Sequence, residues 1–201
     1  MTDHVEISFK KFDDCSTRAK SLCGLHQYLN SSHQTKLIDY DDLLRSSIIL
    51  VVSAFDYLVH EIFHRECLHR IEGGKIEPSF HVPLSLGPDL LNRKKELSNF
   101  IVATNSYKSF VAPDKFAAIV RVLVDKPWEK MATELKVSEQ EAKSRLRDIV
   151  DWRNRLAHQA DINPNYGGSE LYPICRLDTE EAISDMIEYG KALCTVIRTS
   201  R

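Results

Sequence analysis

The sequence predicts an all-α fold, a helical bundle built around one long central helix, in a single domain of 201 residues. Apolar residues recur at spacings of three and four along most of the chain, which indicates amphipathic helices. The stretch from Asp41 to Ile71 is apolar nearly all round in its middle, as expected of a helix at the centre of a bundle. A strand-like pattern occurs only in a short piece around residues 171–177. These observations favour the all-α class.

The expected helices follow one another with clear breaks between them. Asn30-Ser31-Ser32 ends the first and Gly73-Gly74 the second, and the proline-containing residues 75–89 form an irregular connector. After a loop at residues 163–176, Asp178 with Glu181 caps the last helix. Helices are therefore expected over residues 8–29, 41–71, 90–102, 114–124, 127–135, 138–161 and 179–199.

The helix over residues 138–161 has clear signals at both ends. Ser138 followed by Glu141 forms a capping box, and Asn163-Pro164 stops the periodicity just past its end. At roughly 100° per residue, Arg153 stands where an apolar stripe should continue. That stripe consists of Ala142, Leu146, Ile149 and Leu156. A buried guanidinium needs a partner, so we expect the Arg153 side chain to enter a core, a cleft or a subunit interface.

Three polar side chains near the end of this helix suit phosphodiester chemistry. Arg153 offers a permanent planar cation for a phosphate, and His158 can move protons near neutral pH. Asn154 lies one turn before His158 and can orient its imidazole or donate to an oxyanion. RNA would supply its own nucleophile, the 2′-hydroxyl, so this set suits cleavage without a metal ion.

The segment from Arg153 to His158 resembles the Arg-Asn-x-x-x-His signature of HEPN domains. Its flanks, Ile149-Val150-Asp151 and Gln159-Ala160-Asp161, are similar to those of the RiboL-PSP-HEPN branch. The run from Asp42 to Tyr57 resembles the early long helix of that branch. With the closing helix at residues 179–199, the likeness covers most of the chain and implies a HEPN-like bundle.

This resemblance also implies an activity and partners. It points to a metal-independent endoribonuclease of the bacterial toxin or phage-defence type, working as a homodimer with both motifs in one cleft. Arg153 would hold the scissile phosphate, His158 would serve as acid or base, and Asn154 would orient His158 or a phosphate oxygen. The implied partners are RNA, a second copy of the chain and an antitoxin or defence-system protein, with no cofactor. The alternative is an inactive HEPN dimer that only binds RNA or a protein.

Two carboxylates are candidates to support the motif. Asp56, on the apolar-facing side of the central helix, is the first candidate to fix Arg153, and Asp161 is the second. A purely structural explanation stays open at this point. In it Arg153 is paired with an acid such as Asp56, and His158 is a helix-end residue favoured by the dipole.

A basic track on the same helix is a candidate RNA contact. Its residues fall within ~60° on one side of the helix: Lys143, Arg147, Asn154 and His158. Such a track would suit an RNA backbone, and Arg155 is a further candidate. A solvated charged face, interrupted by Asp148 and Asp151, explains the same pattern equally well.

A rival motif stands in the central helix. His60-Glu61-Ile62-Phe63-His64 is a literal His-Glu-x-x-His, in which two histidines one turn apart bind zinc and the glutamate activates water. The longer metzincin pattern fails, because Cys67 stands where a glycine is needed and Arg70 where a third histidine is needed. We prefer histidines on the polar edge of a core helix, with incidental metal binding next and a zinc hydrolase last.

A second rival lies at residues 131–146, which resemble the helix-turn-helix of bacterial transcription regulators. Lys136 replaces the usual turn glycine. Glu139 and Glu141 stand at the end that would enter DNA, where carboxylates would repel phosphates. A plain helical hairpin is the preferred interpretation, and a DNA-binding regulator is the least favoured function.

Composition narrows the setting. A net charge of -2 argues against an overall basic coat, so any RNA contact must come from a local patch. Five cysteines without a Cys-x-x-Cys pair indicate neither a disulfide framework nor a zinc ribbon, and favour a cytoplasmic location. The polar N-terminus does not resemble a signal peptide. The apolar run at residues 48–55 is far shorter than the ~20 residues of a membrane span, so no membrane partner is expected.

Overall fold

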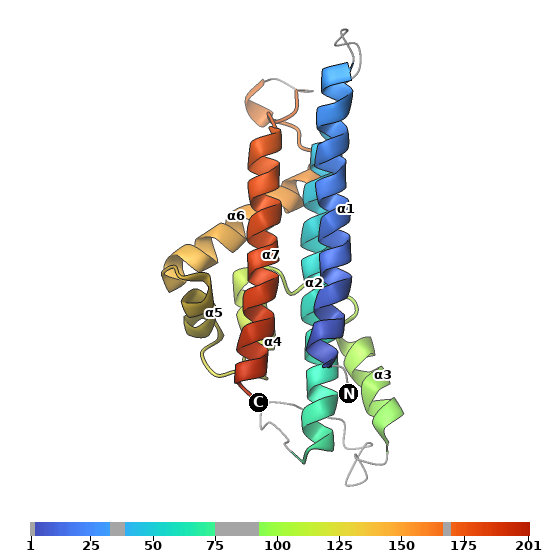
Figure 1. Ribbon diagram of the computed structural model, residues 1–201, viewed down its shortest axis with the longest axis vertical. Coiled ribbons are helices and arrows are strands. Elements are labelled where there is room, and N and C mark those ends of the chain that lie inside the picture. The colour runs from blue at the N-terminus through green and yellow to red at the C-terminus, as the bar shows by residue number, and fades with distance from the viewer. Residues whose placement is uncertain (1–2, 33–38, 75–92, 167–169) are drawn as a thin grey trace.

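Figure 1 shows the computed structural model of the chain, which describes residues 3–32, 39–74, 93–166 and 170–201. These ranges contain seven α-helices, one short 3-10 helix and no strand. The all-α prediction is therefore confirmed. The helices are α1 (His4–Ser32), α2 (Asp41–Glu72), α3 (Lys94–Asn105), α4 (Pro113–Val120), α5 (Pro127–Leu135), α6 (Glu139–His158) and α7 (Arg176–Thr199), with the 3-10 helix η2 (Pro164–Tyr166) between the last two.

Three long helices, α1, α2 and α7, lie side by side along the length of the molecule, and the two termini lie at the same end (Figure 1). α2 packs against α1, α3, α4, α6 and α7, which confirms the predicted central helix. Its middle is exposed only along one stripe, which contains Ile49, Ser53 and Tyr57. α6 crosses the bundle, with its first half beside α5 and its last turns against α2 (Figure 1).

The contact between α1 and α7 includes Gly190, which lies against the ring of Phe12. A Cβ at this position would lie 2.4 Å from Cε1 of Phe12, so a larger residue forces the aromatic ring to move. Phe12 lies 6.2 Å from Phe55 of α2 between ring centroids, and Phe55 lies 6.4 Å from Tyr189. The three long helices thus meet in an aromatic core, in which Gly190 leaves room for the Phe12 ring against the backbone of α7.

Among the described helices, α2 alone has the length and composition to cross a membrane. The expectation that its apolar run is too short rested on residues 48–55, whereas the apolar window spans 18 residues. Of that window, 56% is buried inside the protein. Packing against the surrounding helices therefore accounts for an apolar composition of this kind.

α1 is longer than the sequence predicts, because it begins at His4 and continues through Asn30-Ser31-Ser32. These polar residues were expected to break the helix. Instead their side chains bond within it, since the Asn30 amide contacts Nε2 of His26 at 2.9 Å and the Ser31 hydroxyl donates to the Tyr28 carbonyl at 2.9 Å. Side-chain bonds of this kind satisfy the polar groups without ending the helix.

α7 begins earlier than the predicted cap at Asp178. Cys175 is the N-cap residue, and its Sγ accepts a hydrogen bond from the backbone N–H of Asp178 at 3.4 Å. The Thr179 hydroxyl donates back to the Cys175 carbonyl at 2.9 Å. Asp178 consequently lies in the first turn, where a carboxylate favours the positive end of the helix dipole.

The other boundaries agree with the sequence to within a few residues. α2 ends just before its predicted glycine pair, and Gly74 has a φ of 74°. The predicted connector at residues 75–89 and the start of the next predicted helix lie outside the described residues. α4 ends at residue 120 rather than 124. The strand-like piece forms only an isolated bridge between Ile162 and Leu171.

α5 and α6 form the predicted helical hairpin. Lys136 makes the turn in the left-handed region, with φ 58° and ψ 37°, although it is not a glycine. Trp128 and Met131 of α5 are buried, and α5 packs against α7 as well as α6. Glu139 and Glu141 are exposed in the first turn of α6. Packing and capping therefore explain the hairpin, which agrees with the plain helical hairpin that the sequence analysis preferred over a DNA-binding helix-turn-helix.

Candidate functional site

α6 carries the Arg153-to-His158 motif and begins as the sequence predicts. The Ser138 hydroxyl accepts a hydrogen bond from the backbone N–H of Glu141 at 3.1 Å. The predicted apolar stripe is buried throughout, at Ala142, Leu146, Ile149 and Leu156. The cap fixes the start of the helix and the stripe fixes its rotation, so the positions of the motif residues around α6 follow from local sequence.

Arg153 lies on the side of α6 that faces the core. Its side chain is half-buried, and Nε is a buried atom that has no hydrogen-bond partner within the described part of the chain. A cation removed from water without an anion is unfavourable. Arg153 therefore interrupts the buried stripe with a partly buried cation, and the described residues supply no anion for it.

Asn154 and His158 lie one turn apart at the end of α6. Asn154 is half-buried and His158 is exposed as the last residue of the helix. Among the described residues, none forms a hydrogen bond or an ion pair with either side chain. His158 therefore presents an accessible imidazole within a turn and a half of Arg153.

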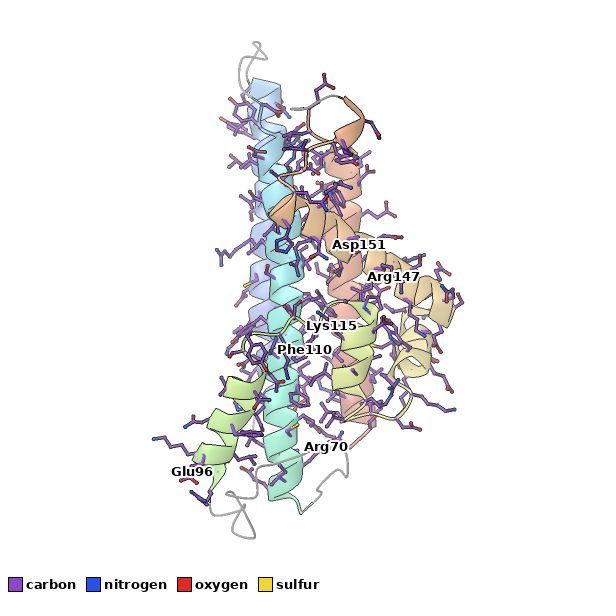
Figure 2. All side chains as sticks on the ribbon, turned by 180° about the vertical axis from the view of Figure 1, so that it is seen from behind. Arg70, Glu96, Phe110, Lys115, Arg147 and Asp151 are labelled. Carbon is purple, nitrogen blue, oxygen red and sulfur yellow. The ribbon has the colours of Figure 1, made fainter. Side chains whose placement is uncertain are left out.

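Asp56 does not pair with Arg153, which corrects the first expectation for a supporting carboxylate. Its Oδ1 accepts a hydrogen bond from the backbone N–H of Phe110 at 2.8 Å and lies 3.8 Å from Nε2 of His60. Phe110 precedes α4 and is marked in Figure 2. Asp56 therefore accepts the backbone N–H of Phe110 and holds the segment before α4 against α2, and it does not hold Arg153.

Asp161 does not pair with Arg153 either, which corrects the second expectation. It is 2% exposed, and its two carboxylate oxygens accept from Nε of Arg155 at 2.8 Å and from Nε of Arg45 at 2.9 Å. The guanidinium of Arg155 lies 4.1 Å from the centroid of the Tyr172 ring. Arg155, expected as an RNA contact, is therefore held mainly by groups of the protein itself.

The basic track divides into paired and unpaired cations. Lys143 forms an ion pair with Glu139. Arg145, which is not part of the predicted track, bonds Glu141 at 2.6 Å. Arg147 is exposed, and the described residues contain no ion-pair partner for it although Asp151 lies one turn further on (Figure 2). Arg147 was predicted to contact the RNA backbone, and no carboxylate among the described residues forms an ion pair with it.

The His-Glu-x-x-His sequence lies in α2 beside α3, and its histidines have separate partners. Nε2 of His60 is 3.0 Å from the carbonyl oxygen of Lys108, and Nε2 of His64 is 2.9 Å from the Ser98 hydroxyl. Glu61 bonds Nε of Arg65 at 2.8 Å. Burial lowers the pKa of His64. No group of three potential metal ligands occurs among the described residues, so the zinc-hydrolase interpretation gains no support.

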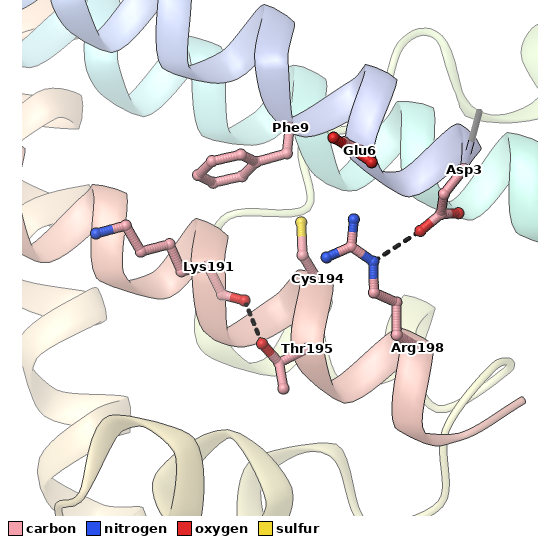
Figure 3. A pocket seen from close by; sticks show the side chains of 7 residues that line it. All are labelled: Asp3, Glu6, Phe9, Lys191, Cys194, Thr195 and Arg198. Carbon is pink, nitrogen blue, oxygen red and sulfur yellow. Dashed lines mark hydrogen bonds and ion pairs between the residues drawn. The ribbon is translucent and has the colours of Figure 1, made fainter.

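Two hollows on the described surface are lined by residues outside the motif. One, of about 320 Å³, lies between α2 and α3 beside His60 and His64. The other, of about 490 Å³, lies between α1 and α7, where Arg198 bonds Asp3 at 2.7 Å (Figure 3). Its one thiol, Cys194, has a pKa raised to about 12 by burial, so it is a poor nucleophile at neutral pH.

Two residues of the site escaped the sequence analysis, Arg45 and Tyr172. Arg45 is 9% exposed and meets Asp161 from a position 116 residues away. A charged residue within an apolar helix is the sequence signal that points to such a buried pair. Tyr172 carries no comparable signal, because its role follows from the turn that brings residues 161 and 172 together.

The RiboL-PSP-HEPN family model matches residues 13–199 of the chain. No curated protein and no solved structure matches the chain. The match covers most of α1 and all of α2 to α7, so it applies to the whole bundle rather than to the six-residue motif alone.

Proposed function

We propose that this chain, which belongs to the RiboL-PSP-HEPN family, is an endoribonuclease that cleaves RNA without a metal ion. The observation that carries the proposal is the half-buried Arg153, whose Nε has no partner among the described residues, close along α6 to the exposed His158. Family membership makes RNA the substrate class to consider first. The unpaired cation supplies what a phosphate needs.

Arg153 holds the scissile phosphate in this mechanism. Its guanidinium is charged at any physiological pH and presents N–H donors in a fixed plane. Because no described carboxylate competes for it, the charge is available to the non-bridging oxygens, on which negative charge builds in the transition state. Partial burial strengthens that interaction, since fewer water molecules screen it.

His158 moves the proton. The 2′-oxygen of the substrate attacks phosphorus, the bond from phosphorus to the 5′-oxygen breaks, and the 2′-hydroxyl proton leaves to a base. His158 serves as that base or as the acid that protonates the 5′-oxygen. Asn154, one turn earlier, orients the imidazole or a phosphate oxygen. The products are a 2′,3′-cyclic phosphate and a 5′-hydroxyl.

A local contact holds the RNA backbone. The net charge of -2 gives no general attraction for nucleic acid, so single cations matter. Arg147 is exposed and unpaired within the described chain, whereas Lys143 is already bonded to Glu139. Arg147 is therefore the proposed phosphate contact on this face of α6.

Two copies of the chain form the working unit in this proposal, with both motifs facing one cleft. The supporting observation is that Arg153 and His158 lie on one helix without partners from the described chain. The proposed setting is a cytoplasmic toxin or phage-defence system, in which an antitoxin or a defence-system protein is the further partner.

Cleavage of total RNA and tRNA on denaturing gels, with EDTA present, tests the proposal. Wild type, Arg153→Ala, His158→Ala and Arg145→Ala are compared, the last because Arg145 is an exposed cation of the same helix paired with Glu141. Cleavage by wild type and Arg145→Ala alone supports the proposal. Equal cleavage by His158→Ala means that the activity comes from a contaminant. Absence of cleavage by a folded wild type that still binds RNA favours the inactive binding module.

A further inference from the structure

The chain folds back sharply under the end of α6. Ala160 and Asp161 have φ values of 49° and 57°, in the left-handed region that non-glycine residues seldom adopt. The backbone N–H groups of Gln159 and Asp161 both donate to the carbonyl oxygen of Arg155, at 2.9 Å and 3.3 Å. This turn brings the Asp161 side chain to the helix that it has just left.

The Asp161 carboxylate then joins separate segments of the chain. One oxygen accepts from Arg155 of α6 at 2.8 Å, and the other accepts from Arg45 of α2 at 2.9 Å. Arg45 also donates from Nη2 to the carbonyl oxygen of Tyr172 at 3.0 Å, and the Tyr172 N–H donates to the Asp161 carbonyl at 2.9 Å. We call these four residues, Arg45, Arg155, Asp161 and Tyr172, the Asp161 clamp.

The clamp acts on the turn of α6 that bears the motif. Arg155 lies between Asn154 and His158, and the last carbonyls of a helix have no partner within the helix. An end left in that state frays. Arg155 is held through its side chain and its carbonyl at once, so the final turn is fixed against α2. A catalytic side chain is effective only when its position and orientation relative to the substrate are fixed.

We infer that Asp161, together with Arg45, is a positioning residue for His158. The inference rests on the proposed ribonuclease function, but it concerns residues that touch neither substrate nor the reacting atoms. Without the clamp, the final turn of α6 loosens and His158 loses its fixed position along the helix relative to Arg153. Chemistry then slows, while the cations that bind RNA remain.

The test compares wild type with Asp161→Asn, which keeps the size of the side chain and removes its charge. Glu66→Gln is the matched control. Glu66 is 0% exposed and accepts from Nε of Arg70 at 3.0 Å and from Nη2 of Arg201 at 3.1 Å, near the opposite end of α2. Arg45→Lys is the second variant, since lysine keeps the charge but cannot hold Asp161 and the Tyr172 carbonyl in the same planar arrangement.

Amide hydrogen exchange and the NMR signals of the His158 imidazole measure the effect without reference to activity. In Asp161→Asn we expect exchange at residues 155–159 to be about tenfold faster, with the His158 signals shifted. Glu66→Gln should change neither. Arg45→Lys should move both in the same direction to a smaller extent, which keeps the test open if Asp161→Asn does not fold.

RNA cleavage supplies the second measurement. We expect kcat to fall about tenfold or more in Asp161→Asn, with KM within about twofold of wild type, because orientation changes and binding does not. Unchanged exchange and His158 signals in both variants overturn the inference, and so does an equal change in Glu66→Gln. A wild type that cuts no RNA overturns the proposed function, and exchange with the His158 signals then decides the positioning role alone.

Discussion

Two half-buried arginines lie on opposite sides of the last turns of α6, and they differ in their partners. On one side Arg155 bonds the buried Asp161 and lies over the Tyr172 ring. On the other, Arg153 has a buried Nε for which the described chain offers no partner. A paired guanidinium holds the fold together, whereas an unpaired one costs stability. The proposed phosphate contact of Arg153 rests on this difference, because Arg155 already has an anionic partner in the chain and Arg153 has none among the described residues.

Replacing Arg153 by methionine is expected to have the largest effect. Cleavage should fall by roughly 10³-fold, since the charge that stabilises the transition state is removed. Stability should stay the same or rise, because an apolar side chain of similar length replaces a half-buried cation whose Nε has no partner among the described residues. Cleavage rates and thermal melting check the two parts, and a lower melting temperature would show that Arg153 has a partner in the folded chain.

Arg155→Met tests the paired arginine of the same comparison. It leaves one oxygen of a buried carboxylate without its cation, so the free energy of unfolding should fall by about 2 kcal/mol. Urea denaturation measures this loss. If Arg155→Met is as stable as Arg153→Met, the two sides of α6 do not differ in the way the contacts indicate.

At the opposite end of the bundle, the carboxylates of Glu66 and Asp3 make stability depend on pH. Burial raises the pKa of Glu66, but hydrogen bonds from Arg201, Arg70 and His4 outweigh it, so the pKa lies below the ordinary 4.5. Burial also opposes the shift at Asp3, where bonds from Arg198 and the Val5 amide still lower the pKa from 3.8 to about 2.

A lowered carboxylate pKa adds stability that is present above the unfolded-state pKa and is lost as the pH falls through the folded one. Glu66→Gln should therefore be less stable than wild type at pH 7, by about 1 kcal/mol, because glutamine keeps one acceptor. The difference should shrink below pH 4.5. Denaturation from pH 7 to pH 3 checks this, and a constant difference would contradict it.

The smallest effects are expected among the exposed cations of α6. Arg147→Ala should weaken RNA binding about threefold and reduce its salt dependence, because one phosphate contact is lost. Lys143→Ala should change affinity less, since Glu139 already offsets that charge. Binding measured at two salt concentrations distinguishes the variants, and a larger loss in Lys143→Ala would reverse the assignment.

Much of the bundle followed from local sequence. α5 has the predicted bounds, α2 ends at its glycine pair, and α6 starts at its Ser138 cap. These features depend on residues within a turn or two of one another. The errors at the end of α1 and the start of α7 arose where side chains bond locally in a way that composition alone does not distinguish.

The sequence by itself determined that Arg153 interrupts a buried stripe and that His158 follows near the end of the same helix, because helical periodicity fixes which residues share a face. Only the tertiary structure decided the partners of the charges. Asp56 bonds the Phe110 amide, and Asp161 joins Arg155 to Arg45, 116 residues away. Such pairs depend on how α6 crosses α2 and on two left-handed residues after it, and no local pattern encodes that geometry.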